Sequence, residues 1–158
     1  MRRLLIGLLL LPALLLSACQ QAPGDEPTPS TEDVVTSDIA DVDVSGEAGE
    51  KPVVSWDGRF EAAATERRVL EEGKPDAKVV ALGDRVELNY LGVNGRDGTE
   101  FDTSFGNPEP ASFVLKEGAL IAGFITALEG AKVGSRVMVG ITPEDGYGAQ
   151  GGQPSAGI

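Results

Sequence analysis

The chain has 158 residues, enough for one folded domain of roughly 100 residues with accessory segments but not for two full domains. Its 25 acidic and 13 basic residues give a formal net charge of −12, which argues against nucleic-acid binding because an acidic surface repels the phosphate backbone. The absence of histidine excludes histidine metal sites and histidine-dependent nucleophiles, and the 21 glycines and 10 prolines predict a loop-rich fold that contains strands.

Residues 1–18 have the three-part layout of a secretory signal. Arg2 and Arg3 precede an apolar run at 4–16, whose thirteen residues are too few to cross a bilayer core of about 30 Å as a helix. The sequence Leu-Ser-Ala-Cys at 16–19 resembles a bacterial lipobox, which implies lipid attachment at Cys19 and cleavage before it. We therefore expect a cell-envelope protein, anchored by lipid to a membrane and facing outside the cytoplasm. The alternative is an ordinary signal peptide with an incidental cysteine.

Residues 19–50 have the composition of a disordered tether. Between 20 and 50 the chain carries nine acidic residues and no Lys or Arg, among Pro, Ser, Thr and Gly. Such a segment buries little apolar surface, and its like charges extend it. The alternative is an acidic stretch that binds a metal or a partner.

The folded domain is predicted to span 51–158. Its first part, 52–60, has a partly alternating apolar pattern that could add an edge strand to the following domain. Trp56 is the single tryptophan, and we expect it to pack in the core rather than to bind a ligand.

The next elements are predicted to be strands. A short strand covers 67–70, and alternating apolar and polar residues at 85–90 indicate a strand with one buried face. The sequence Asn-Gly-Arg-Asp-Gly at 94–98 tolerates positive φ and predicts a hairpin turn. Phe101 and the run 113–115 are candidates for the partner strand.

The last predicted elements are a helix and a strand. Phe124, Ala127 and Leu128 lie three and four residues apart, which predicts a short helix at 124–129 that stops at Gly130. Alternation at 135–141 predicts a further strand. The expected fold class is α+β, with a curved antiparallel sheet wrapped around one short helix.

Five motifs carry a resemblance to the FKBP-type peptidyl-prolyl cis/trans isomerases. They stand in family order with near-family spacing, at 83–92 (GDRVELNYLG), 97–104 (DGTEFDTS), 120–124 (LIAGF), 130–136 (GAKVGSR) and 143–148 (PEDGYG). The resemblance covers roughly residues 67–158. It identifies 51–158 as an isomerase domain and, with the lipobox, suggests the bacterial lipoprotein form of the family.

The resemblance implies an apolar pocket that takes up a proline ring and the peptide bond before it. The residues that it implies for catalysis are Tyr90, Phe101, Asp102, Ile121 and Tyr147. Those that it implies for substrate binding are Phe113, Leu120, Phe124 and Ile158. In the family the main-chain N–H at the position of Ile121 and the hydroxyl at that of Tyr147 donate hydrogen bonds. Without the order of the five motifs along the chain, we would interpret Phe101, Phe113 and Tyr90 as core residues.

The sequence departs from the family pattern at three places. Phe124 stands where the family usually has a tryptophan, and Ala111 occupies a position that is often aromatic. The chain stops at Ile158, where family members continue into an alternating apolar strand. We therefore expect an incomplete and unstable domain, unless another segment supplies the strand, for which 52–60 is the internal candidate.

The leading functional prediction is a peptidyl-prolyl isomerase that assists the folding of exported proteins. Its partners would be proline-containing polypeptides and, through the same pocket, macrolide inhibitors, without a cofactor, a metal or nucleic acid. The alternative from another class is a non-catalytic, membrane-tethered chaperone or proline-peptide-binding module. A structural envelope protein is the third hypothesis.

Overall fold

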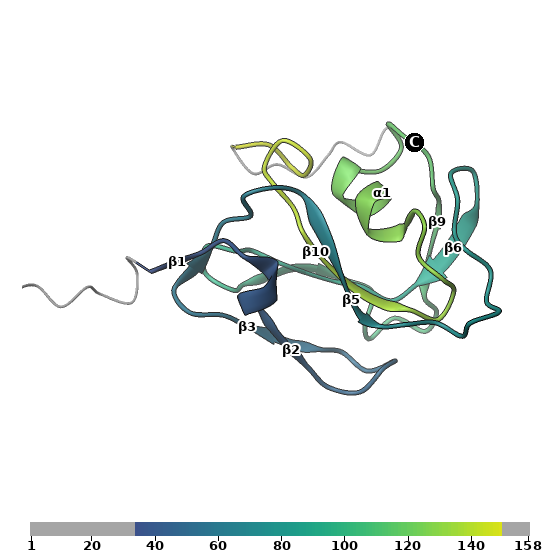
Figure 1. Cartoon of the computed structure of the whole chain (residues 1–158), viewed down its shortest axis with the longest axis horizontal. Coiled ribbons are helices and arrows are strands. Elements are labelled where there is room, and N and C mark those ends of the chain that lie inside the picture. Colours follow the sequence, from purple (N-terminus) through teal and green to yellow (C-terminus); the bar gives the residue numbers. More distant parts are fainter. Residues whose placement is uncertain (1–33, 150–158) are drawn as a thin grey trace, which may run out of the picture.

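The computed structural model describes residues 34–149 (Figure 1). The predicted signal at 1–18, the lipidation site Cys19 and the predicted substrate-binding residue Ile158 lie outside this range. In chain order the elements are β1 (Val35–Thr36), the 3-10 helix η2 (Ile39–Asp41), β2 (Asp43–Ser45), β3 (Val53–Ser55), β4 (Arg59–Phe60), β5 (Glu66–Glu71), β6 (Arg85–Leu88), β7 (Leu91–Val93), β8 (Glu100–Thr103), β9 (Ala111–Val114), α1 (Ala122–Leu128) and β10 (Arg136–Gly140).

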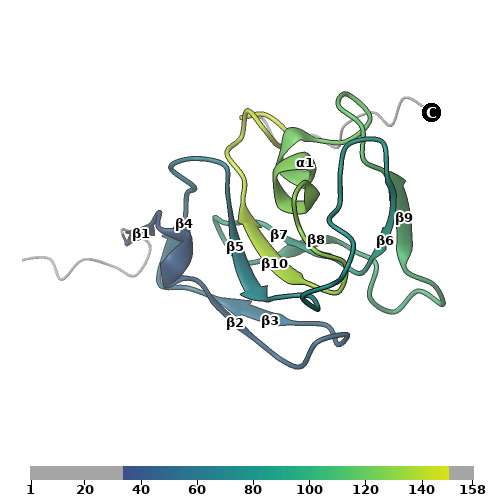
Figure 2. The same ribbon diagram turned by 45° about the vertical axis from the view of Figure 1, so that its right-hand side comes forward.

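The described strands form five two-stranded sheets. β5 pairs with β10, β6 with β9, β7 with β8 and β2 with β3, all antiparallel, whereas β1 and β4 are parallel. Helix α1 packs against β5 and β10 on one side, and the β2–β3 hairpin lies on the opposite side (Figures 1 and 2). The predicted fold class is confirmed, with mostly strands and one short helix.

Helix α1 begins two residues before its predicted start. Its Ala127 is buried, with 7% of its surface exposed. Gly123 allows the helix to approach the chain after β10, because a Cβ on Gly123 would lie 2.5 Å from Cδ1 of Ile141. Gly130 has a φ of 75°, which favours glycine, and it follows the C-cap residue Glu129, so the predicted helix stop is confirmed.

The predicted hairpin at 94–98 is confirmed and joins β7 to β8. Asn94 closes the loop, since its N–H donates to the carbonyl of Thr99 (2.8 Å) and its carbonyl accepts from the N–H of Gly98 (2.7 Å). Gly98 has a φ of 70°, a conformation that other residues rarely adopt. Strand β6 alternates exposed and half-buried residues as predicted, and of its two candidate partners the run at 113–115 is confirmed, since β6 pairs with β9, whereas Phe101 lies in β8, which pairs with β7.

The predicted tether is wrong for residues 34–50, which are folded against the domain. Val42 and Ile39 are buried, with 2% and 7% exposed. The guanidinium of Arg68 in β5 donates to the carbonyls of Ala40 (2.9 Å) and Val42 (2.5 Å). A few apolar side chains and an arginine from elsewhere in the chain thus order a segment whose average composition indicates disorder. The folded part therefore begins before residue 51.

Residues 52–60 do form strands, but they pair within this N-terminal part. Val54 of β3 stands opposite Val44 of β2, and β4 pairs with β1. The segment therefore neither adds an edge strand to the sheets of the following domain nor replaces a strand between them. Among residues 34–149, no helix is long and apolar enough to cross a bilayer.

Replacing Val42 with Ala tests whether residues 34–50 belong to the folded unit. The change removes two carbon groups from a buried site, at about 0.8 kcal/mol each plus a cavity cost, so we expect unfolding free energy to fall by about 2 kcal/mol. Urea unfolding followed by Trp56 fluorescence measures it.

The matched control is Val53→Ala in the same N-terminal part, where 66% of the side chain is exposed. We expect this variant to change stability by less than about 0.5 kcal/mol. Equal stability of the two variants would show that the packing of Val42 contributes nothing.

Candidate functional site

Five aromatic residues gather beside helix α1. Tyr90 lies between β6 and β7, Phe101 is in β8, Phe113 in β9, Phe124 in α1, and Tyr147 in the turn after β10. The rings of Tyr90, Phe113 and Phe124 contact one another edge to face, with centroids 5.5 to 6.1 Å apart. Phe101 and Tyr147 form a second edge-to-face pair at 5.6 Å. The predicted pocket residues from three elements, the β6–β7 connection and one turn therefore lie together.

Asp102 connects the two aromatic groups. The hydroxyl of Tyr90 donates a hydrogen bond of 2.7 Å to Oδ2 of Asp102. The neighbouring residue in β8 is Phe101, half of whose surface is exposed and therefore open to a ligand. A carboxylate at this place orients the tyrosine ring and brings a negative charge close to an otherwise apolar surface.

Both tyrosines are held in the neutral form. Burial, then the hydrogen bond to Asp102 and the charge of that carboxylate, raise the pKa of Tyr90 to about 12. Burial and the charge of Asp102 also raise the pKa of Tyr147 above its usual value. The two hydroxyls therefore remain hydrogen-bond donors through the physiological pH range.

Ser104 holds the backbone of Tyr90 and was not predicted as a site residue. Only 2% of Ser104 is exposed, and its Oγ accepts a hydrogen bond from the N–H of Tyr90 (2.9 Å) and contacts Oδ1 of Asn89 (3.2 Å). The N–H of Ser104 and the hydroxyl of Thr103 both donate to the carbonyl of Tyr90, at 3.0 and 2.9 Å. The signal was available in the motif at 97–104, whose last two residues are hydroxylic.

The turn that carries Tyr147 is tied to the start of α1. The N–H of Gly123 donates to the carbonyl of Asp145 (2.9 Å), and the N–H of Gly148 donates to that of Pro143 (2.7 Å). Gly148 has a φ of 75°, which the tight turn requires. These hydrogen bonds fix the turn beside the helix and so place Tyr147 next to Phe101.

The remaining predicted residues lie at the same end of α1. Ile121 is its N-cap residue, and Leu120 precedes it in a short bridge to Glu117. Gly92, which was not predicted, lets the ring of Phe101 lie against the backbone of β7, since a Cβ there would stand 2.8 Å from Cζ of Phe101. The chemical roles given to the pocket residues stay predictions.

A separate hollow of about 460 Å³ lies in the N-terminal part, away from the aromatic residues. It is lined by Val34, Thr36, Ala40, Asp41, Asp43 and Asp57. This hollow has no aromatic side chain and is not the predicted pocket. Within residues 34–149, no cluster of three or more Cys, Asp or Glu side chains is arranged to hold a metal ion.

Comparison with known proteins places these residues in a family. A family model described as FKBP-type peptidyl-prolyl cis-trans isomerase matches residues 77–157. FK506-binding protein 2 of Aspergillus fumigatus is 40% identical over 75 residues, which cover 48% of this chain and 56% of that relative. A probable FK506-binding protein of Corynebacterium glutamicum is 41% identical over 76 residues, covering 48% and 63%. An FK506-binding protein of Streptomyces anulatus is 34% identical over 102 residues, covering 65% and 81%.

The matched parts include the aromatic site but not the whole of every relative. The chain spans 56% and 63% of the fungal and corynebacterial proteins, and 81% of the streptomycete protein. All five aromatic residues and Asp102 fall inside the matched range 77–157, whereas the folded segment before residue 77 falls outside it.

The coupling between Tyr90 and Asp102 can be measured by ultraviolet titration. The protein has two tyrosines, so Tyr147→Phe leaves Tyr90 as the single titrating phenol. We expect Tyr90 to ionise at about pH 12 and Asp102→Asn, added to this background, to bring its pKa part of the way back to 10, because burial remains. Since the folded pKa is raised, the stabilisation is complete below about pH 10 and is lost as the pH rises through about 12.

The control is Asp97→Asn, which removes an exposed carboxylate from the β7–β8 loop. We expect this variant to leave the titration of Tyr90 unchanged, because Asp97 bonds to Thr99 and not to the tyrosine. A titration of Tyr90 near pH 10 with Asp102 intact would contradict the observed hydrogen bond.

Proposed function

The chain belongs to the FKBP-type peptidyl-prolyl cis-trans isomerase family, and from this premise we propose that it accelerates rotation about X-Pro peptide bonds. The observation that carries the proposal is the pairing of Phe101 with Tyr147 beside Asp102, inside the matched range. An exposed aromatic surface of this kind offers contact area to a proline ring. Macrolides, which the names of the relatives associate with them, would bind the same surface.

The reaction suits a site without histidine. Rotation about an X-Pro bond passes through a twisted amide that has lost resonance, against a barrier of about 20 kcal/mol. No proton is transferred and no covalent bond forms or breaks. A site lowers the barrier by excluding water from the amide and by contacts that are stronger in the twisted geometry than in the planar one.

Each pocket residue has a distinct task in this proposal. Phe101, Phe113 and Phe124 exclude water and contact the proline ring. The hydroxyl of Tyr147 donates a hydrogen bond to the substrate, which is worth about 1 kcal/mol net. Asp102 acts through Tyr90, whose ring it orients.

The main-chain N–H of Ile121 would donate a hydrogen bond to a substrate carbonyl. Ile121 is the N-cap residue of α1, and the backbone N–H groups at the start of a helix have no partner within the helix. Phe124 offers less area than the tryptophan of other family members, and for that reason we expect a weaker hold on macrolides than in those members.

We further propose that the protein works in the cell envelope on exported polypeptides. The support is the signal-like composition of residues 1–18 and the lipobox-like sequence that ends at Cys19. Two or more acyl chains at Cys19 give stable membrane attachment, since each buried CH₂ contributes about 0.8 kcal/mol. The residues that the structure describes begin at 34, so about 15 residues of chain would separate the lipid on Cys19 from them.

A proline-limited refolding assay tests the proposed activity. We expect the protein to accelerate the slow phase, with kcat/KM nearly constant between about pH 6 and 8 because the chain has no histidine. Tyr147→Phe should lower kcat/KM about fivefold, since it removes one hydrogen bond of about 1 kcal/mol. Asp102→Val should lower kcat/KM further than Tyr147→Phe, because it removes the hydrogen bond that orients the ring of Tyr90.

Asp97→Asn is the control and should keep full activity, because Asp97 belongs to the turn. Binding of a proline peptide without acceleration would favour the non-catalytic binding module instead. A bell-shaped pH profile centred near neutrality would contradict a mechanism without proton transfer.

Replacing Cys19 with Ala tests the anchor. In a bacterial host we expect the wild-type protein to sediment with membranes, and Cys19→Ala to accumulate as an uncleaved precursor or to leave the membrane fraction. Thr28→Ala, which leaves residues 16–19 intact, should behave as wild type. A mature N-terminus with an unmodified thiol, seen by mass spectrometry, would refute lipid attachment.

A further inference from the structure

The aromatic site is divided between two sheets that do not pair with each other. Phe101 and Asp102 belong to β8, in the β7–β8 sheet, and Tyr147 follows β10, in the β5–β10 sheet. Among residues 34–149, no strand pairing joins these two sheets. Other contacts must therefore fix the distance between the two sides of the site.

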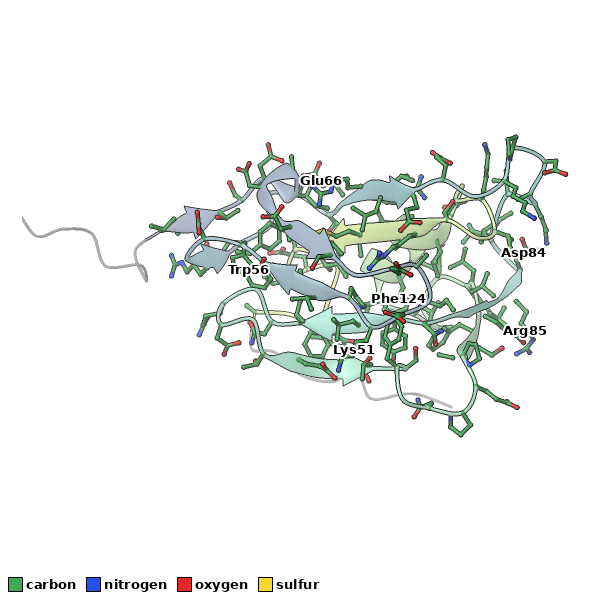
Figure 3. All side chains as sticks on the ribbon, turned by 90° about the horizontal axis from the view of Figure 1, so that it is seen from below. Lys51, Trp56, Glu66, Asp84, Arg85 and Phe124 are labelled. Carbon is green, nitrogen blue, oxygen red and sulfur yellow. The ribbon has the colours of Figure 1, made fainter. Side chains whose placement is uncertain are left out.

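Residues 51–60, here called the bridging segment, contact the β7–β8 sheet at three points. The N–H of Phe60 donates to the carbonyl of Gly95 (2.7 Å) in the loop between the strands. Nζ of Lys51 lies 2.5 Å from Oε2 of Glu100 in β8. The ring of Trp56 lies near Gly98, where a Cβ would be 3.9 Å from Cη2. Figure 3 labels Lys51 and Trp56 of the bridging segment.

The bridging segment also contacts the β5–β10 sheet. The ring of Phe60 lies over Gly140 of β10, where a Cβ would stand 3.2 Å from Cζ of Phe60. The ring of Trp56 packs on Phe60 with centroids 6.1 Å apart. The N-terminal part that carries this segment is held to the same sheet by Arg136, whose Nη1 donates to the carbonyl of Gly46 (2.7 Å).

We propose that Lys51, Trp56 and Phe60 are positioning residues for the isomerase site. They hold the β7–β8 sheet against β10, so that Phe101 and Asp102 stay within reach of Tyr147. The proposal rests on the proposed function, and it adds a task for a segment that lies before the family match at 77–157. A misplacement of about 1 Å between the two sides can cost a large part of the activity.

A pair of glycine variants separates positioning from stability. A methyl group on Gly95 would overlap the carbonyl oxygen of Phe60, and one on Gly73 would overlap that of Val133, far from the site. Neither glycine has a positive φ, so alanine adds the same kind of steric conflict at both positions. Both variants should lose stability, but Gly95→Ala alone should shift the bridging segment away from the β7–β8 loop.

The readouts are KM and kcat/KM for a proline peptide, together with the amide NMR resonances of Phe101 and Asp102, at a temperature where all variants are folded. We expect Gly95→Ala to raise KM, to lower kcat/KM about tenfold and to shift both resonances. Gly73→Ala should stay within about twofold of wild type in both KM and kcat/KM, because a Cβ on Gly73 meets Val133, Lys132 and Ser135 and not the bridging segment. Equal effects of the two variants, or unshifted resonances in Gly95→Ala, would overturn the proposal.

A second pair applies if Gly95→Ala does not fold. Lys51→Met breaks the contact with Glu100, and Lys51→Arg restores it. We expect the methionine variant to shift the resonance of Phe101, and the arginine variant to return it toward wild type. Identical spectra for wild type and Lys51→Met would overturn the role of Lys51. If wild type accelerates no proline isomerisation, the proposed function fails, and these resonances still decide whether the bridging segment positions β8.

Discussion

The site depends on the hydrogen bonds that join Tyr90 to the end of strand β8. The N–H of Tyr90 donates to the buried hydroxyl of Ser104, its carbonyl accepts from Ser104 and Thr103, and its own hydroxyl donates to Asp102. A single residue thereby connects the strand that carries Phe101 to the aromatic group under α1. Each hydrogen bond contributes about 1 kcal/mol net to stability. Leaving the buried Ser104 without its partners would cost about 1 to 3 kcal/mol, so breaking part of this network costs more than the broken bonds contribute.

The electrostatic character of the site follows from this network. Asp102 accepts a hydrogen bond from Tyr90, and burial together with the charge of Asp102 keeps both tyrosines neutral. Because the pKa values of both tyrosines are raised, neither hydroxyl ionises near neutral pH, and the chain has no histidine. These properties suit the proposed rotation about X-Pro bonds, which transfers no proton.

The sequence allowed prediction of the local elements and of which aromatic residues gather beside α1, because both depend on short motifs. The loop at 94–98, the stop at Gly130 and the gathering of Phe101, Asp102 and Tyr147 follow from residues close together in the chain or from the family order. The sequence did not predict the folding of residues 34–50, because this folding depends on Arg68, which lies 26 residues beyond Val42 in the chain. The pairing of β1 with β4 and of β2 with β3 was equally missed, because β1 and β2 lie within a segment whose composition indicated a tether.

The pairing of β5 with β10 gives the chain a folding unit that is larger than the range matched by the family model. The shared range, 77–157, contains β10 and every aromatic residue of the site, but β5 ends at Glu71. A fragment that begins at residue 77 would keep the aromatic residues of the site but would leave the backbone of β10 without its partner along five registered positions. The range that the family model matches and the cooperative unit of folding therefore have different boundaries, because β5, which completes the sheet against which α1 packs, lies before residue 77.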